Sequence, residues 1–384
     1  MVPSSTLPDR RAQIFAQLKT VVVKVGSRIL TQDDNSLNEE SLAHLVDQIA
    51  LIQDRGLAVV LVTSGAVGLG MGVLGYTLRP TELAEKQACA AIGQIRLMHR
   101  YAELFGAKGR PVGQILLSAD DFREKGRFNN IRHTVSTLLG KGVLPIINEN
   151  DTITTDEIKV GDNDKLSADV AHFLEADLLI ILSDEDGLFD KNPKSHRDAK
   201  RVDTVERITP DILALAEATP GSRVSVGGMK AKLTAIRQAT EAGTPCVLAR
   251  GWRVQLGDIV QGRVNGTLFL PKLDRIKRTK RWLAYVSRAR GQFILDPGGV
   301  KAIRTGKVSL LPAGIREVKG HFKPGDFVEL LSPEGEVLGR GRTAYDTDEV
   351  NRIKGLKSGR IAEVLGRKGP DEVIHRDKLV VYGD

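Results

Sequence analysis

Residues 143–173 read Val143-Leu-Pro-Ile-Ile-Asn-Glu-Asn-Asp-Thr-Ile-Thr-Thr-Asp-Glu-Ile-Lys-Val-Gly-Asp-Asn-Asp-Lys-Leu-Ser-Ala-Asp-Val-Ala-His-Phe173. The apolar opening, 143–147, predicts a buried strand, because Val, Leu and Ile follow one another with a single Pro near the start. That strand ends in polar side chains, Asn148, Glu149, Asn150 and Asp151. In open parallel sheets ligands bind beyond the carboxyl ends of the strands, so this is where we expect a ligand.

A second polar cluster stands a short loop later, at Asp162, Asn163 and Asp164. It opens a predicted helix, whose apolar positions are Leu166, Val170, Ala171 and Leu174. Asn and Asp commonly cap helices, so some of these groups satisfy backbone N–H groups while others face a ligand. Either cluster alone is ordinary turn chemistry, but two in tandem indicate a site for a small ligand with an ammonium group.

Strands and helices alternate on both sides of this stretch. The sequence predicts strands at 21–27, 57–62, 111–117, 177–184, 245–249 and 266–270, with helices at 38–54, 83–98 and 129–139 between them. In the second helix the apolar positions are Leu83, Ala88, Ala91, Ile92, Ile95 and Met98. Such alternation predicts an α/β fold with an open, mainly parallel sheet sandwiched by helices.

Lysines and glycines fall at other strand and helix ends. Lys24 lies in a predicted buried strand, where an ammonium group is costly without a partner anion. The glycine-rich run 63–72, with Ser64 and Gly65 near its start, follows a strand and offers backbone N–H groups to an anion. Glycines also precede Lys230 and Lys232 at a helix start, where the helix dipole favours a phosphate.

The common nucleotide fingerprints are missing. Gly70, Gly72 and Gly75 have the G-x-G-x-x-G spacing but begin well past the strand, and no G-x-x-x-x-G-K-[ST] run occurs. The sequence therefore argues against a dinucleotide fold and a P-loop. The loop 185–193 is either a plain connection or a wall for a nucleobase.

These groups together fit phosphoryl transfer from a nucleotide, a reaction that asks for alignment and positive charge over the moving group. Lys24 and Lys232 would supply that charge from opposite sides, with Mg2+ bridging the phosphates and N–H groups near Gly65 orienting the acceptor. A carboxylate acceptor is already ionised at neutral pH, so no general base is required.

Composition separates the chain into two parts. The 384 residues are 41% hydrophobic and carry a net charge of +8, and length alone favours two domains. Residues 271–384 hold 24 Lys and Arg against 15 Asp and Glu, a net +9, which leaves −1 for residues 1–270. A basic module suggests a nucleic-acid partner or simply a solvated surface. Two cysteines, Cys89 and Cys246, without a signal sequence or a membrane-length apolar run, predict a cytoplasmic location and no membrane contact.

Beyond a basic connector at 271–281, short apolar runs alternate with turns. The turn signals are Asp296-Pro-Gly-Gly299, Lys323-Pro-Gly-Asp326 and Ser332-Pro-Glu-Gly335. Their spacing predicts a small all-β barrel.

Six segments resemble the amino acid kinase family: 22–27, 62–66, 147–151, 159–164, 186–190 and 227–232. The likeness covers about residues 20–270, and Val160-Gly-Asp-Asn-Asp164 is its most specific part. The Ser309-Leu-Leu-Pro-Ala-Gly-Ile315 run and its surroundings resemble a PUA domain. We therefore expect a kinase domain at 18–270, a basic linker at 271–284, a PUA domain at 285–370 and a tail at 371–384.

The resemblance is nearest to the glutamate-phosphorylating branch of the family. It implies that ATP, with Mg2+, phosphorylates the γ-carboxylate of L-glutamate in the first step of proline biosynthesis. It further implies feedback inhibition by L-proline and a homotetramer.

The resemblance also assigns roles to residues. Lys24 and Lys232 would be catalytic, and the substrate would contact Ser64, Gly65, Asn148, Asp151, Asn163 and Asp164. ATP would contact Lys24, Ser183, Asp184, Val226, Gly227, Gly228, Met229, Lys230, Ala231 and Lys232. Ser183 and Val226 stand where the family more often has threonine, and both replacements keep the backbone groups that can contact ATP. The metal ligands stay open, with Asp162 and Asp164 as candidates beside phosphate oxygens and water.

Two alternatives remain. Another member of the family, acting on acetylglutamate, aspartate, carbamate or a nucleoside monophosphate, would share the lysines but is not expected to pair the Asp-Asn-Asp cluster with a PUA module. An RNA-binding protein would explain the basic carboxyl-terminal third. That third has few aromatic side chains for base stacking, so we do not favour RNA.

Overall fold

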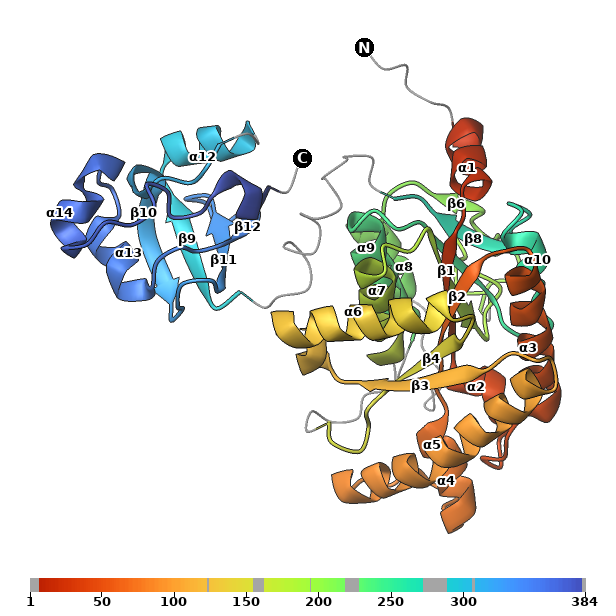
Figure 1. Cartoon of the computed structure of the whole chain (residues 1–384). Coiled ribbons are helices and arrows are strands. Elements are labelled where there is room, and N and C mark those ends of the chain that lie inside the picture. Colours follow the sequence, from red (N-terminus) through yellow and green to blue (C-terminus); the bar gives the residue numbers. More distant parts are fainter. Residues whose placement is uncertain are drawn as a thin grey trace. The chain divides into compact units, whose positions relative to one another are not determined.

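The computed structural model describes residues 7–122, 124–154, 162–193, 195–217, 228–271, 289–305 and 308–381. The chain divides into two compact units, Met1–Lys272 and Leu273–Asp384 (Figure 1). Each unit has a hydrophobic core of its own. The predicted linker at 271–284 falls almost wholly outside the described residues.

The first unit is built on an eight-stranded sheet in the order β3-β4-β2-β1-β5-β7-β8-β6. Its strands are β1 Thr20–Val25, β2 Ala58–Val62, β3 Val112–Leu117, β4 Leu144–Glu149, β5 Leu178–Ser183, β6 Thr204–Val205, β7 Cys246–Arg250 and β8 Gly266–Phe269. Among the described strands, β7 and β8 pair antiparallel and the other neighbours pair parallel. The predicted mainly parallel sheet is confirmed.

Helices cover both faces of this sheet (Figure 1). They are α1 Leu7–Ala16, α2 Ser27–Leu30, α3 Glu39–Asp54, α4 Ala66–Leu74, α5 Leu83–Gly106, α6 Lys125–Gly140, α7 Asp162–Phe173, α8 Pro210–Glu217, α9 Met229–Glu241 and α10 Leu256–Ile259. On one side α7 contacts α9 and the strands β1, β2, β4 and β5, and on the other α3 and α5 contact each other and the strands β2 and β3. The sequence analysis did not anticipate α1, whose Ile14 and Phe15 pack against the core.

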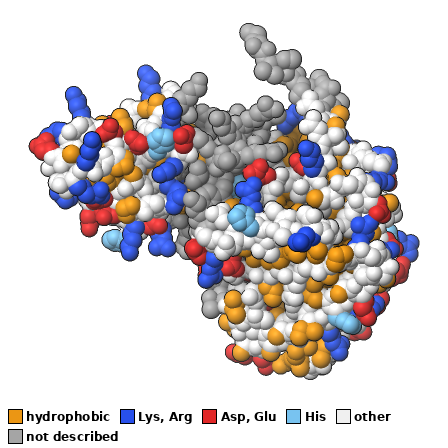
Figure 2. Space-filling model, in the orientation of Figure 1, with side chains coloured by type: hydrophobic (Ala, Val, Ile, Leu, Met, Phe, Trp, Pro, Cys, Tyr) orange, Lys and Arg blue, Asp and Glu red, His pale blue; other side chains and the backbone are white. Residues whose placement is uncertain are grey.

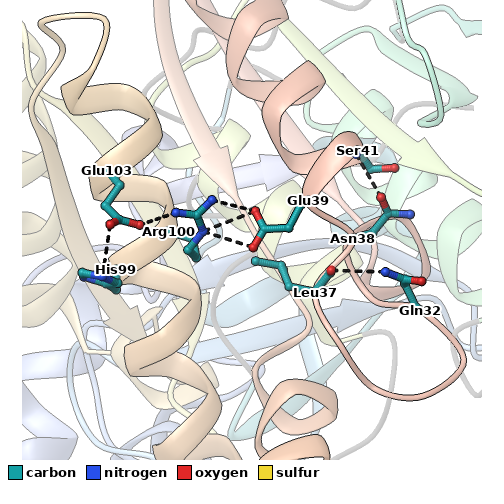
Figure 3. A network of polar contacts seen from close by, with 8 residues as sticks. All are labelled: Gln32, Leu37, Asn38, Glu39, Ser41, His99, Arg100 and Glu103. Atoms are coloured by element: carbon teal, nitrogen blue, oxygen red, sulfur yellow. Dashed lines mark hydrogen bonds and ion pairs between the residues drawn. The ribbon is translucent and has the colours of Figure 1, made fainter.

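Helix α3 forms as its sequence predicts. The Asn38 side chain caps it by accepting a hydrogen bond from the Ser41 N–H, and its predicted apolar face is buried, namely Leu42, Leu45, Val46, Ile49 and Ile52. Figure 3 shows how its first residue, Glu39, also contacts α5. The Arg100 guanidinium of α5 donates to both carboxylate oxygens of Glu39 and also pairs with Glu103. These pairs are half exposed, so they orient the two helices more than they stabilise them.

None of the six apolar positions named above for this helix is on the buried face of α5. The helix buries Cys89, Ala90, Gly93, Gln94, Leu97, Tyr101 and Phe105, whereas Ile95 is 74% exposed and Ala91 is exposed too. Close packing of α4 is the reason. A Cβ on Gly93 would lie 1.8 Å from the Ala66 carbonyl oxygen, and one on Gly70 would lie 1.8 Å from the Cys89 carbonyl oxygen. The glycine face therefore turns inward, and larger apolar side chains turn outward.

The second unit contains a five-stranded sheet in the order β10-β9-β11-β12-β13. Its strands are β9 Gly291–Leu295, β10 Ile315–Gly320, β11 Phe327–Leu331, β12 Val337–Arg342 and β13 Leu379–Val381. The strands β9 and β11 pair parallel, and the other neighbouring pairs are antiparallel. In the described part of this unit the helices are α12 Pro297–Arg304, α13 Thr347–Ile353 and α14 Ile361–Leu365.

Two of the three predicted turns are turns, and the third is a helix start. The Asp326 N–H donates to the Lys323 carbonyl, and the Gly335 N–H donates to the Ser332 carbonyl. The run 296–299 instead begins α12, because the Asp296 side chain accepts a hydrogen bond from the Gly299 N–H with Pro297 at the first helical position. Asp-Pro-Gly is typical of a helix start as well as of a turn, so the predicted turn at 296–299 is wrong.

None of the helices in the described part of the chain combines the length and the apolar character needed to cross a membrane.

Candidate active site

The candidate residues gather at the carboxyl ends of four adjacent strands, β4, β2, β1 and β5. In the register of the sheet, Lys24 of β1 stands between Val62 of β2 and Ile181 of β5. Asn148 lies in β4, Ser64 lies just after β2, and Ser183 ends β5. The strands are almost wholly buried Val, Leu and Ile, so they hold these polar ends on a rigid support.

Two lysines far apart in the sequence converge on one carboxylate. The Lys24 Nζ lies 2.5 Å from Asp164 Oδ1, and the Lys232 Nζ lies 3.6 Å from Asp164 Oδ2. Asp164 is 1% exposed and Lys24 is 4% exposed. A buried ionic triad of this kind costs much desolvation and adds little net stability, which makes it unusual as a purely structural device.

The triad perturbs its own pKa values. Burial by itself raises the pKa of Asp164, but the charges of Lys24 and Lys232 outweigh it and hold the pKa below its usual range. Burial lowers the pKa of Lys24, and the attraction of Asp164 opposes that effect while the like charge of Lys232 adds to it. A negatively charged group arriving at this point would meet both ammonium groups.

An amide cluster lies beside the triad. The Asn163 Nδ2 donates to Ser64 Oγ at 3.0 Å and to Asn148 Oδ1 at 3.1 Å. The backbone N–H of Glu149 donates to the amide oxygens of Asn148 and Asn163, at 2.9 and 3.3 Å. Gly65 begins α4 with a φ of +105°, a left-handed conformation that suits glycine and leaves the helix start without a side-chain cap.

The first turn of α7 belongs to both the amide cluster and the triad. Asn163 donates to Ser64 in the amide cluster, and its neighbour Asp164 pairs with Lys24 in the triad. The predicted convergence is therefore present for the residues that the structure describes, Lys24, Lys232, Asn148, Asn163 and Asp164. Residues 155–161, between the two polar clusters, lie outside the description. Asp151, two residues beyond β4 in the turn after it, is partly buried.

On the other side of Lys24, the end of β5 carries Ser183 and Asp184. Ser183 is 2% exposed, and its Oγ donates to Asp184 Oδ1 at 3.1 Å. The Arg28 Nη1 lies 2.9 Å from Asp184 Oδ2. Burial raises the pKa of Asp184, but the hydrogen bond from Arg28 and its charge are among the effects that outweigh it and lower the pKa overall.

The start of α9 supplies Lys232. Gly228 is the N-cap and has no side-chain cap, and among the described residues other than its chain neighbours no atom lies within 4 Å of a Cβ placed on it. Met229 and Ala231 are partly buried there, and Lys230 is exposed. Val226 and Gly227, which we predict to contact ATP, lie outside the described residues.

Carboxylates for a metal ion are scarce. Among the residues that the structure describes, no group of three or more His, Cys, Asp and Glu side chains could hold a metal ion. Asp164 is already engaged by two lysines, and the side chain of Asp162 lies outside the description. The described residues therefore do not form a protein cage for Mg2+.

Sequence reasoning missed two residues near the site. Arg28 pairs with Asp184, and Gln94 accepts a hydrogen bond from the Asn148 Nδ2 at 2.7 Å. Arg28 follows Lys24 closely in the sequence, so a search for charged residues after that strand finds it. Gln94 could not be singled out from the apolar pattern alone, because that pattern marks no polar residue. In the structure it is a polar side chain among apolar ones on the buried face of α5.

Comparison with known proteins adds a family to this geometry. The model of the amino acid kinase family matches residues 19–250, and the PUA domain model matches residues 291–365. The chain is 45% identical over 97% of its length to a protein named glutamate 5-kinase from Syntrophus aciditrophicus, of which it covers 97%. Proteins of the same name from Deinococcus radiodurans and Geobacter sulfurreducens are 47% and 44% identical, over 94% and 97% of this chain and 99% and 100% of their own.

Proposed function

We propose that this chain, a kinase that belongs to the amino acid kinase family and carries a PUA domain, transfers the γ-phosphoryl group of ATP to the γ-carboxylate of L-glutamate. The products are ADP and L-glutamyl 5-phosphate, and the reaction is the first step of proline biosynthesis. The observation that carries the proposal is the convergence of Lys24 and Lys232 on the buried Asp164, beside an amide cluster that suits an amino acid. The names of the near full-length relatives support glutamate as the acceptor.

In this reaction an oxygen of the substrate carboxylate attacks the γ-phosphorus, and the bond from that phosphorus to the β,γ-bridging oxygen breaks. Charge builds on the equatorial oxygens of the phosphoryl group as it moves. Lys24 from β1 and Lys232 from α9 stabilise that charge, and Asp164 keeps both ammonium groups in place before the substrate arrives. No proton leaves the acceptor, so the site needs no general base.

The acceptor side is built from Ser64, Gly65, Asn148, Asp151 and Asn163. Asp151 pairs with the substrate ammonium group, and the free N–H groups at the start of α4, together with Ser64, bind carboxylate oxygens. The nucleotide side is formed by Ser183 and Asp184 at the end of β5 and by the open start of α9, residues 228–232. Mg2+ arrives as part of the substrate MgATP, held by phosphate oxygens and water.

Two finer features belong to the proposal. L-proline inhibits by occupying or overlapping the glutamate pocket, since it shares the α-carboxylate and the charged amino nitrogen of glutamate. The chain assembles as a homotetramer.

A coupled ADP-release assay tests the function directly. The panel is L-glutamate, L-aspartate, N-acetyl-L-glutamate and carbamate, each with and without L-proline. The proposal expects turnover with L-glutamate above the other acceptors and a loss of that turnover when L-proline is added. Preference for another acceptor would overturn the assignment of glutamate, and indifference to L-proline would overturn the inhibition alone.

A further inference from the structure

Gln94 is a buried polar side chain on the apolar face of α5, and it is 8% exposed. Its place is fixed from both sides. The adjacent Gly93 packs against the carbonyl of Ala66, and the Tyr101 hydroxyl, two turns further along α5, hydrogen-bonds to Thr63 Oγ1 at 3.0 Å. Because Thr63 precedes Ser64, this face of the helix lies against the amide cluster of the site.

In the amide cluster, the backbone N–H of Glu149 determines which side-chain atoms donate and which accept hydrogen bonds. The Glu149 N–H can only donate, so the side-chain oxygens of Asn148 and Asn163 that it meets are acceptors. The Asn163 Nδ2 must then donate to Ser64 Oγ, and the Asn148 Nδ2 must donate to Gln94 Oε1 at 2.7 Å. This chain of bonds settles the amide orientations without reference to a ligand.

With these directions, two hydrogen-bond donors of the cluster have no acceptor within it, the Ser64 hydroxyl and the Gln94 Nε2. Ser64 Oγ accepts from Asn163, so its own proton is directed elsewhere. The Gln94 Nε2 is buried and has no hydrogen-bond partner among the residues that the structure describes. A buried donor without a partner is costly, and such groups are usually explained by a ligand or a water molecule.

We propose that Gln94 is a positioning residue for the acceptor substrate. Its Oε1 fixes the Asn148 amide, which in turn orients Asn163 and leaves the Ser64 hydroxyl as a donor to a substrate carboxylate. Gln94 acts through Asn148 and sits on the acceptor side of the site, so it tunes acceptor binding and leaves the nucleotide side alone. The inference rests on the proposed function for the identity of the acceptor.

Two substitutions separate this role from a structural one. Gln94→Leu removes the acceptor for Asn148, and we expect the KM for L-glutamate to rise about 10-fold while the KM for ATP stays within about twofold of the wild type. Gln94→Glu keeps the acceptor oxygen. A buried carboxyl group favours its neutral form, which mimics the amide by accepting through C=O and donating through O–H. The KM of Gln94→Glu for L-glutamate should therefore approach the wild-type value near about pH 6.5 and diverge from it near about pH 8.5.

The matched control is Gln53→Leu, the same change at a partly buried glutamine near the end of α3, which precedes the amino end of β2. We expect wild-type kinetics from it. Equal changes in the two KM values for Gln94→Leu, an unchanged KM for L-glutamate, or a Gln94→Glu profile parallel to the wild type would each overturn the proposal. A wild type that ignores L-glutamate would overturn the proposed function instead, and the KM ratios would then be measured with the acceptor that it does phosphorylate.

Discussion

Asp164 is the residue on which the electrostatics of the site depend. It is 1% exposed and faces both Lys24 and Lys232. Without its charge, the buried Lys24 ammonium group would lose the carboxylate oxygen 2.5 Å away, and Lys232 would lose the one 3.6 Å away. Asp164 therefore stabilises, in the unliganded protein, the two lysine charges that the reaction needs.

Asp164→Asn should lower the free energy of unfolding at neutral pH by about 3 kcal/mol, because it breaks a buried pair from one side. The pKa of Lys24, already lowered by burial, falls further in this variant. The folded variant then binds fewer protons than the unfolded chain, so its stability rises with pH toward the unfolded lysine pKa. Urea unfolding at neutral and alkaline pH measures both effects.

The control for that experiment is Asp203→Asn, which removes an exposed carboxylate that lies 3.8 Å from Arg201. Surface pairs of this kind contribute at most about 1 kcal/mol, so the control should unfold nearly as the wild type does. Equal stability of Asp164→Asn and Asp203→Asn at neutral pH would contradict the account of the triad.

Individual site residues could be predicted where a polar side chain stands at the end of a strand or the start of a helix. Lys24, Asn148 and the Asn163-Asp164 pair follow from polar groups at strand and helix ends. What each side chain would face could not be predicted. Asp164 was expected at the substrate, and the structure engages it with the two lysines, because its orientation depends on how α7 and α9 pack.

Helices α7 and α9 carry two of the three members of the triad, Asp164 and Lys232, and a buried contact further along joins the helices. The Gln238 Nε2 of α9 donates to Asp169 Oδ1 of α7, and Asp169 is 7% exposed. Burial raises the pKa of Asp169 to about 6, with only partial relief from Lys165 and from the Gln238 hydrogen bond. The pairing of these helices should therefore be sensitive to mildly acidic pH.

The sign of that dependence follows from proton binding. Between about pH 4 and about pH 6 the folded state binds more protons at Asp169 than the unfolded chain, so this residue's contribution to stability falls as the pH rises through that window. Asp169→Asn keeps an acceptor for Gln238 and removes the titration. Relative to the wild type, the variant should gain about 2–3 kcal/mol as the pH rises from about 4 to about 7. A difference in unfolding free energy that does not change with pH would contradict the prediction.

Most elements could be predicted from hydrophobic periodicity, and the two exceptions have different causes. The buried face of α5 could not be predicted, because Gly93 and Gly70 allow two backbones to approach, a tertiary effect that periodicity does not contain. The start of α12 at Asp296 was read as a turn because the same residues serve both structures.

The whole chain consists of two units with separate hydrophobic cores, and the charge is concentrated in the second. On the face that Figure 2 shows, the basic side chains of the second unit are spread out with acidic ones among them. The candidate active site is made of residues from the first unit. Catalysis is therefore expected to reside in the first unit alone.

A chain ending at Lys272 should retain ADP release with L-glutamate within about 10-fold of the full chain, because domains with their own core can fold alone. Loss of turnover in a truncated chain that melts cooperatively would place part of the site in the second unit. A salt-dependent shift of labelled RNA by residues 271–384 would instead support the nucleic-acid alternative.

The proposed catalysis requires Lys232 and Lys24 together to stabilise the moving phosphoryl group. It is tested by the kcat for ADP release with L-glutamate by Lys232→Met, beside Lys165→Met as a control that removes an exposed lysine of α7. We expect a loss of about 100-fold or more in kcat for Lys232→Met, with little change in the KM for L-glutamate. We expect near wild-type turnover for the control. Equal kcat values for the two variants would show that Lys232 does not stabilise the moving group.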